Sequence, residues 1–148
     1  MMKATASIHL HVNIIGAEEL LLIFRRLCDM SISPEFRMSP QRRDIWDNTD
    51  PTRCGRPPCC DEGLHSPEQL IERLVRFALS AEVLGENVIF PLARDQSFSA
   101  FLSHMTTLFT DVRFNLKGPT LELRTLDSMP ASEFRPRWDI FISSLETL

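Results

Sequence analysis

Glu122 and Arg124 lie two residues apart in the segment 118–130, and their carboxylate and guanidinium groups are able to bind ligands or take part in catalysis. Alternate side chains of an extended strand share a face, so Thr120, Glu122 and Arg124 point one way, and Leu121 and Leu123 point the other. The simplest interpretation of this pattern is a half-exposed strand with a solvated Glu and Arg face. A carboxylate can also bind a metal ion, and a guanidinium can bind phosphate oxygens.

The N-terminal segment 5–14 alternates in the same way and carries further ligand-type side chains. Its polar face holds His9, His11 and Asn13. Its other face is apolar and is formed by Ile8, Leu10, Val12 and Ile14. Two strands that each turn an apolar face inward are predicted to share one sheet, and the polar face of that sheet is the predicted binding or catalytic site.

Composition limits the class of protein that these strands can belong to. The chain of 148 residues has the length of one domain, and 43% of its residues are hydrophobic and 24% are charged. Its net charge of −4 argues against a nucleic-acid or anionic-membrane surface. No apolar run is long enough to span a membrane, and no signal-peptide pattern is visible.

The four cysteines form no even disulfide framework in the sequence. Cys59 and Cys60 are neighbours, which rarely pair with each other, while Cys28 and Cys54 lie apart from them. This usage predicts reduced thiols and a cytoplasmic protein.

The remaining segments predict the elements that must hold the two strands. Helical spacing of apolar residues predicts helices over 17–29, from Ser66 to about Leu84, from Gln96 or Ser97 onward, and over 132–145. Short strands are predicted over 87–91 and 112–114. The resulting order favours an α+β domain, with a mainly antiparallel sheet and helices packed on one face.

The segment 31–66 differs from the rest because it is rich in proline and arginine. Prolines exclude a continuous regular helix, so we predict a long binding loop with one short helix near 41–46. Trp46 favours an ordered loop rather than a disordered linker.

Several segments, taken in order, resemble the glutamate–cysteine ligase family of plants and many bacteria. Residues 45–55, I-W-D-N-T-D-P-T-R-C-G, are similar to its I-W-x-x-T-D-x-x-R-T-G segment, and 104–113, H-M-T-T-L-F-T-D-V-R, to its H-L-T-T-x-F-P-E-V-R. Ser97-Phe98 with Phe101-Leu102 resembles its S-F-x-x-F-L. Residues 120–127 resemble its E-x-R-x-L-D strand, and the N-terminal strand resembles its I-H-x-N or Q-V-N strand.

The resemblance implies a glutamine-synthetase-like half-domain, because residues 5–130 correspond to the second half of such an enzyme. It implies ATP-dependent ligation of the L-glutamate γ-carboxylate to L-cysteine through an acyl phosphate, the first step of glutathione or related thiol biosynthesis. The implied cofactors are ATP and Mg²⁺, and the implied partners are these small-molecule substrates, with a homo-oligomer or a complementing chain possible.

The resemblance also assigns roles to individual residues. Glu122 and His9 match metal ligands, although some family members place a glutamine at the histidine position. Arg42 matches an arginine that approaches nucleotide or acyl phosphate, Arg113 matches the arginine that closes the H-L-T-T-x-F-P-E-V-R motif, and Arg124 would reach a phosphate. The resemblance thus implies that all three bind the nucleotide and that Arg42 and Arg124 are catalytic. Each arginine is as readily explained as a solvated or salt-bridged side chain.

Other residues and other classes of protein stay open. His11 is a ligand or an exposed strand residue, His104 is expected to be a hydrogen-bonded helix residue, and Asp127 to order the end of the strand. The spacing of Cys54, Cys59, Cys60 and His65 only weakly resembles a zinc module. A truncated, split or inactive ligase fragment that binds a partner is the main alternative to a finished enzyme.

Overall fold

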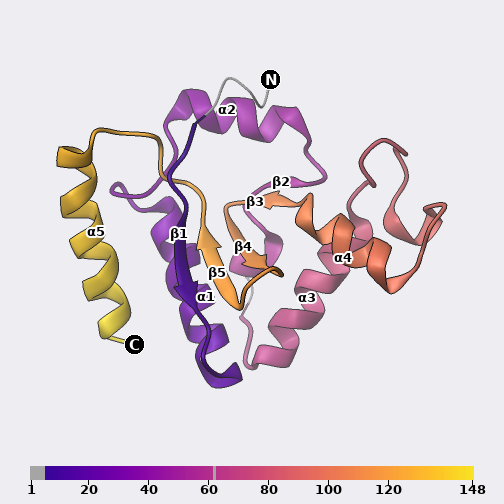
Figure 1. Cartoon of the computed structure of the whole chain (residues 1–148), viewed down its shortest axis with the longest axis horizontal. Helices are drawn as coiled ribbons and strands as arrows, with labels where there is room; N and C mark the ends of the chain where they lie inside the picture. The colour runs from indigo at the N-terminus through magenta and orange to yellow at the C-terminus, as the bar shows by residue number, and fades with distance from the viewer. Residues whose placement is uncertain (1–5, 62) are drawn as a thin grey trace.

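The computed structural model describes residues 6–61 and 63–148, and it is an α+β domain (Figure 1). Its main sheet consists of β1 (Leu10–Asn13), β5 (Thr120–Leu123) and β4 (Val112–Asn115), in the order β1-β5-β4. Both pairings are antiparallel, which confirms the predicted sheet and places the strand with Glu122 at its centre.

A second, smaller sheet was not predicted. It pairs β2 (Cys54–Gly55) with β3 (Phe109–Thr110) in parallel. Gly55 has a φ of +99°, a backbone conformation that residues with a side chain rarely adopt. The glycine therefore lets the chain turn at the end of this two-residue strand.

The predicted helices are present, with ends shifted by a few residues. They are α1 (Ala17–Ile32), α2 (Pro40–Thr49), α3 (Pro67–Ser80), α4 (Phe98–Thr106) and α5 (Ala131–Glu146). Serine side chains cap three of them: Ser39, Ser66 and Ser97 each accept a hydrogen bond from the backbone N–H three residues on.

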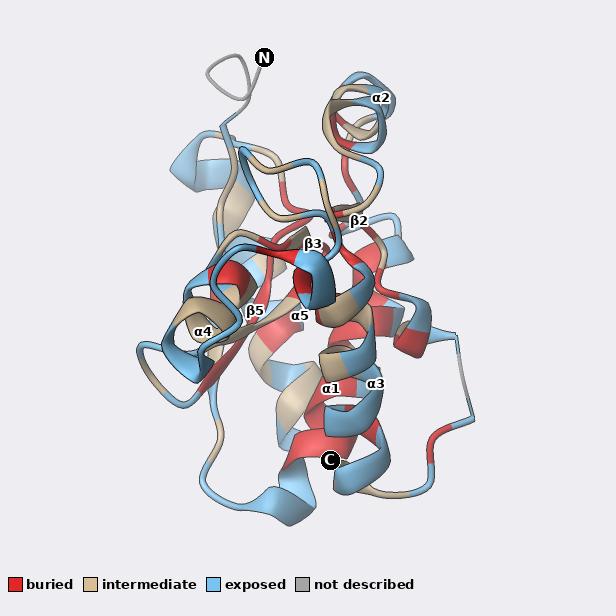
Figure 2. Cartoon of the chain, turned by 90° about the vertical axis from the view of Figure 1, so that its right-hand side faces the viewer, coloured by how far each residue is buried: buried red, intermediate tan, exposed pale blue. Residues whose placement is uncertain are grey.

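The hydrophobic core lies between α1 and the apolar face of the main sheet. Phe24 and Leu27 of α1 are buried with Leu121 and Leu123 of β5, and Phe141 of α5 joins them. Buried residues accordingly run along α1 and β5 in Figure 2. Because α1 takes up this face, the face that carries Glu122 points away from the core.

The predicted strand over 87–91 is wrong. The described chain forms a 3-10 helix there, η3 (Phe90–Leu92), after an isolated bridge between Glu82 and Ile89. Pro91 has no N–H to donate to a neighbouring strand. Phe90 is instead buried and stacks on the His104 ring, with centroids 5.4 Å apart.

The proline- and arginine-rich segment 31–66 is ordered over its described residues, as Trp46 suggested. It contains α2, β2 and a short 3-10 helix, η2 (Pro58–Cys60), and Trp46 is buried. The predicted short helix near 41–46 is therefore confirmed as α2, which is longer than expected.

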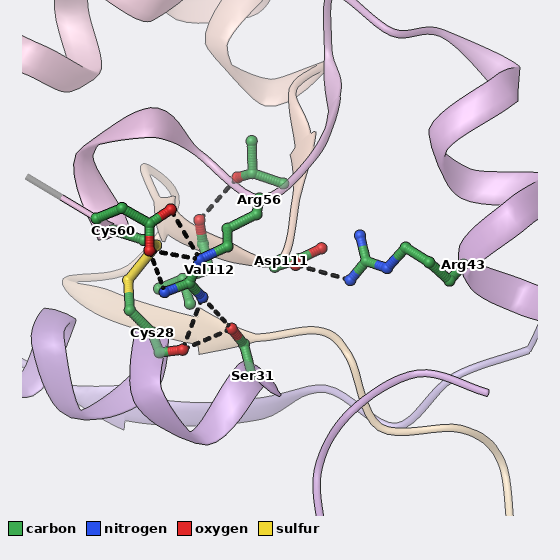
Figure 3. The surroundings of a disulfide bond; sticks show 9 residues. Cys28, Ser31, Arg43, Arg56, Cys60, Asp111 and Val112 are labelled. Atoms are coloured by element: carbon green, nitrogen blue, oxygen red, sulfur yellow. Dashed lines mark hydrogen bonds and ion pairs between the residues drawn. A yellow bond between two sulfur atoms is a disulfide. The ribbon is translucent and has the colours of Figure 1, made fainter. Parts of the chain in front are cut away.

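A disulfide joins Cys28 of α1 to Cys60 of η2, contrary to the prediction of reduced thiols (Figure 3). The Cα atoms are 5.5 Å apart, a usual spacing for a disulfide. Arg56 supports the same junction by donating to the carbonyl of Cys28 and to Ser31 Oγ, and by pairing with Asp61. Closing a loop of this sequence separation stabilises a fold by about 4 kcal/mol.

No helix among the described residues is long and apolar enough to cross a membrane. The cytoplasmic location stays a prediction.

Candidate functional site

The polar face of the main sheet brings together side chains from all three strands. In the register of the sheet, Glu122 of β5 lies opposite His11 of β1 on one side. On the other side it lies opposite Arg113 of β4. Directly opposed residues on neighbouring strands place their Cβ atoms about 5 Å apart, so these three side chains meet.

Glu122 is buried, which corrects the expectation of a solvated strand face. It is 3% exposed, and Arg113 donates from Nε to Oε2 over 3.1 Å and from Nη2 to Oε1 over 3.2 Å. The Arg124 Nη1 atom lies 3.6 Å from Oε2. Two guanidinium groups therefore compensate the buried carboxylate, and this compensation is what allows a charge to lie inside the fold.

Arg124 is a buried cation that lies beside aromatic rings. It is 5% exposed, and its guanidinium carbon is 5.6 Å from the centre of the Phe109 ring and 6.0 Å from that of Trp46. Its Nε and Nη1 atoms are buried and have no hydrogen-bond partner among the described residues. Burial, followed by the charge of Arg113, lowers the pKa of Arg124 to about 10, so the side chain is still charged at neutral pH.

Two histidines complete this face at the β1 edge. The His9 Nε2 atom and Ser7 Oγ form a hydrogen bond of 3.0 Å, and His11 Nδ1 lies 3.3 Å from Thr120 Oγ1 and 3.8 Å from Glu122 Oε1. One ligand-type atom from each of His9, His11 and Glu122 lies within 4.8 Å of the other two.

The His9 ring is neutral at physiological pH. Its pKa is lowered to about 4, first by burial and then by the charge of Arg124, which together outweigh the opposing charge of Glu122. A neutral imidazole has a free lone pair on one ring nitrogen, and this lone pair is what binds a metal ion.

Arg42 contacts the chain just beyond the end of β5 through its two terminal nitrogens, while its buried Nε has no hydrogen-bond partner among the described residues. Its Nη1 donates to the carbonyl of Thr125 and to Asp127 Oδ1, both over 2.9 Å, and its Nη2 donates to the carbonyl of Arg124 over 2.7 Å. The guanidinium thus ties α2 to the backbone just after β5. Its predicted contact with a nucleotide stays a prediction.

Arg53 was not singled out from the sequence, although it lies in the T-D-x-x-R segment. It is buried and pairs with Asp50, and its Nη1 has no hydrogen-bond partner among the described residues. The spacing of Asp50 and Arg53 carried the signal. Their role as an ion pair next to β2 could be recognised only from the folded structure.

The expectations for three other positions can now be compared with the structure. His104 is buried and bonds through Nε2 to the carbonyl of Ala78 over 2.8 Å, which confirms a structural role. Asp127 accepts from the Ser39 N–H and from Arg42, and so orders the end of the strand. Cys60 is in the disulfide, so the four-ligand zinc set with Cys54, Cys59 and His65 does not form in this structure.

No family model, curated protein or solved structure matches this chain significantly.

Proposed function

We propose that this chain carries the site of a carboxylate–amine ligase of the glutamate–cysteine ligase type. The proposed reaction joins the γ-carboxylate of L-glutamate to the amine of L-cysteine and consumes ATP. The polar face of the main sheet, with Glu122, Arg124, Arg113 and His9, is the proposed site. The glutamine-synthetase-like half-domain and the cytoplasmic location belong to the same proposal.

One observation carries the proposal: Arg124 is a buried guanidinium whose Nε and Nη1 have no hydrogen-bond partner among the described residues. Burying unsatisfied donors on a charged group costs free energy, and an anionic ligand would recover it. Phosphate and carboxylate oxygens match the fork of guanidinium donors. Every anionic group in the proposed reaction is of one of these two kinds.

The surrounding residues suit a transfer of phosphate to a carboxylate. Phosphoryl transfer needs little covalent chemistry from the protein and depends on positioning and on charge stabilisation. Arg124 and Arg113 lie on either side of Glu122, so they can hold negative oxygens close to it. In the proposed reaction ATP supplies the phosphoryl group, and the cysteine amine then displaces phosphate from the acyl phosphate.

The donor atoms fit the phosphates better than they fit Mg²⁺. Magnesium prefers oxygen ligands in an octahedron, and Glu122 supplies such oxygens. The two side chains closest to it at the β1 edge, His9 and His11, supply nitrogens instead. We therefore assign no step to a magnesium ion.

Phosphate release by the purified chain tests the proposed function. The assay contains ATP, L-glutamate and L-cysteine, with Mg²⁺ in one series and Mn²⁺ in another. We expect release that needs both amino acids and falls by about 100-fold or more in Glu122→Gln, because Arg113 and Arg124 lose the carboxylate that positions them. A thiol-specific product assay identifies the γ-glutamyl peptide.

The matched control is Glu72→Gln, which removes an exposed carboxylate that pairs with Arg76 on α3. Its rate should equal that of the wild-type chain. Equal release by both variants would show a contaminating ATPase, and no release above the blank would overturn the proposal of a stand-alone enzyme.

A partner-dependent fragment is the second candidate, and exposed apolar residues favour it. Ile89, Leu92 and Phe98 are 40%, 69% and 74% exposed and lie close together in the sequence around η3. Large apolar side chains gathered on a surface are typical of an interaction site. This candidate predicts that the chain binds ADP without releasing phosphate, which equilibrium binding and the rate assay together distinguish.

A further inference from the structure

The donor atoms at the β1 edge of the polar face are those of a transition-metal site. His9, which directly precedes β1, and His11 of β1 lie two residues apart, and their ring nitrogens lie close to the buried carboxylate of Glu122 on β5. Imidazole nitrogen suits zinc, iron, nickel and copper, whereas magnesium takes oxygen almost exclusively. Two histidines with one carboxylate is a ligand set found in zinc hydrolases and in non-haem iron enzymes.

We propose that His9, His11 and Glu122 bind one divalent transition-metal ion of the zinc and iron class, in preference to Mg²⁺. The proposal deepens the proposed function and rests on it for the role of the site. Its test measures metal binding and needs no turnover, so either proposal can fail without the other.

The distances allow the three ligands to converge. Their ligand-type atoms lie within 4.8 Å of one another, and bonds of about 2.0–2.2 Å to a common ion need only small side-chain rotations from there. His9 and His11 are exposed, so their rings have room to turn toward the ion. Glu122 is held by the sheet and is the fixed ligand.

One hydroxyl group, that of Ser7, lies where a supporting contact to a metal ligand is usually found. Ser7 Oγ bonds to Nε2 of His9, which leaves the Nδ1 lone pair of that ring free. Thr120 Oγ1 lies 3.3 Å from Nδ1 of His11, the nitrogen that is 3.8 Å from Glu122 Oε1, so His11 would exchange this contact for the ion, whereas the Ser7 bond would remain. Hydrogen bonds of this kind fix the tautomer and orientation of a ligating histidine.

The ion pairs of Glu122 are compatible with a bound metal. A carboxylate has about four lone-pair positions, so Oε1 can turn to the ion while Oε2 keeps its 2.9 Å contact with Arg113 Nη2. Arg113 and Arg124 also add positive charge beside the ion. The open positions on the metal should therefore be filled by anionic oxygens, which agrees with the phosphates of the proposed function.

Titration with cobalt(II) tests the inference, because four- or five-coordinate cobalt absorbs visibly in the ligand-field region. The untagged chain is first freed of metal with EDTA, and Co²⁺ is added with no nucleotide present. We expect one equivalent to bind, Zn²⁺ to displace it, and a large excess of Mg²⁺ to leave the band unchanged. His9→Ala and His11→Ala should each weaken binding by about tenfold or more.

The matched control is His65→Ala, an exposed histidine outside the sheet and next to the cysteines of η2. It should bind cobalt as the wild-type chain does, and the spectrum should lack the intense near-ultraviolet bands of a cobalt thiolate. Displacement of cobalt by equimolar Mg²⁺, no cobalt binding, or an equal loss in all three variants would each overturn the inference. Thermal unfolding of each variant shows whether it is folded.

Discussion

Arg42 and Arg124 are two buried arginines with the same exposure and different surroundings. Each is 5% exposed, and each places its guanidinium within 6.0 Å of the Trp46 ring centre. Arg42 donates three hydrogen bonds to backbone carbonyls and to Asp127. Arg124 lies 3.6 Å from Glu122 and beside the Phe109 and Trp46 rings, and its Nε and Nη1 have no hydrogen-bond partner among the described residues.

The difference separates a cation that stabilises the fold from one prepared for a ligand. Arg42 has only its Nε left without a hydrogen-bond partner among the described residues, so it has recovered most of its desolvation cost within the fold. Arg124 has not, and it lowers stability until an anion binds. Burial alone would have given both arginines the same role.

The largest effect is expected from Arg42→Met. The variant leaves the carbonyls of Thr125 and Arg124 without their donor and Asp127 without its partner. Breaking a buried charged network on one side is strongly destabilising, so we expect the free energy of unfolding to fall by about 3 kcal/mol. Urea denaturation followed by tryptophan fluorescence measures it.

Arg37→Met is the control for this variant because Arg37 is exposed at the turn before α2. Its free energy of unfolding should lie within about 0.5 kcal/mol of wild type. If Arg42→Met proved as stable as this control, the three hydrogen bonds of Arg42 would not hold α2 to the chain after β5. Arg42 would then not be the arginine that stabilises the fold.

Arg124→Met should have a smaller effect on stability and a large effect on binding. Glu122 keeps its two hydrogen bonds from Arg113, and the poorly compensated charge of Arg124 is removed, so we expect the free energy of unfolding to change by no more than about 1 kcal/mol. Loss of the guanidinium should weaken ADP binding by about tenfold or more, measured by isothermal titration calorimetry. If Arg124→Met were as unstable as Arg42→Met and still bound ADP normally, Arg124 would stabilise the fold and would not bind the ligand.

The sequence allowed the local part of this arrangement to be predicted. Alternation along 118–130 correctly placed Glu122 and Arg124 on the face opposite Leu121 and Leu123. The serine caps of the helices were also readable, because Ser66 acts on residues only three positions away. These features depend on neighbours in the chain, and a single segment contains all the information they need.

The aromatic side chains that lie beside Arg124 on the polar face could not be predicted in this way. Trp46 reaches Arg124 from α2, and Phe109 reaches it from β3, across many intervening residues. Cys28 and Cys60 are brought together by the packing of η2 against α1. Neither contact leaves a periodic pattern, so Glu122 was expected to be solvated and the cysteines to be reduced.

The smallest expected effect concerns the histidine end of the same face, where stability should depend on pH through His9. Its folded pKa of about 4 lies below the ordinary value of 6.5, because burial and Arg124 disfavour the charged ring. Between these two values the unfolded chain binds a proton that the folded chain does not. Stability is therefore fully present above about pH 6.5 and falls as the pH is lowered toward 4.

His9→Gln should remove this part of the pH dependence from the metal-free chain. Because the ring is only partly covered and solvent screens its charge, we expect the difference between the two profiles to be only about 1 kcal/mol. Urea denaturation from pH 4 to 7.5 measures it, with His65→Gln as the control that keeps the wild-type slope. Parallel profiles for His9→Gln and wild type would mean that the positive charge of Arg124 does not reach His9, and that the two ends of the polar face act independently.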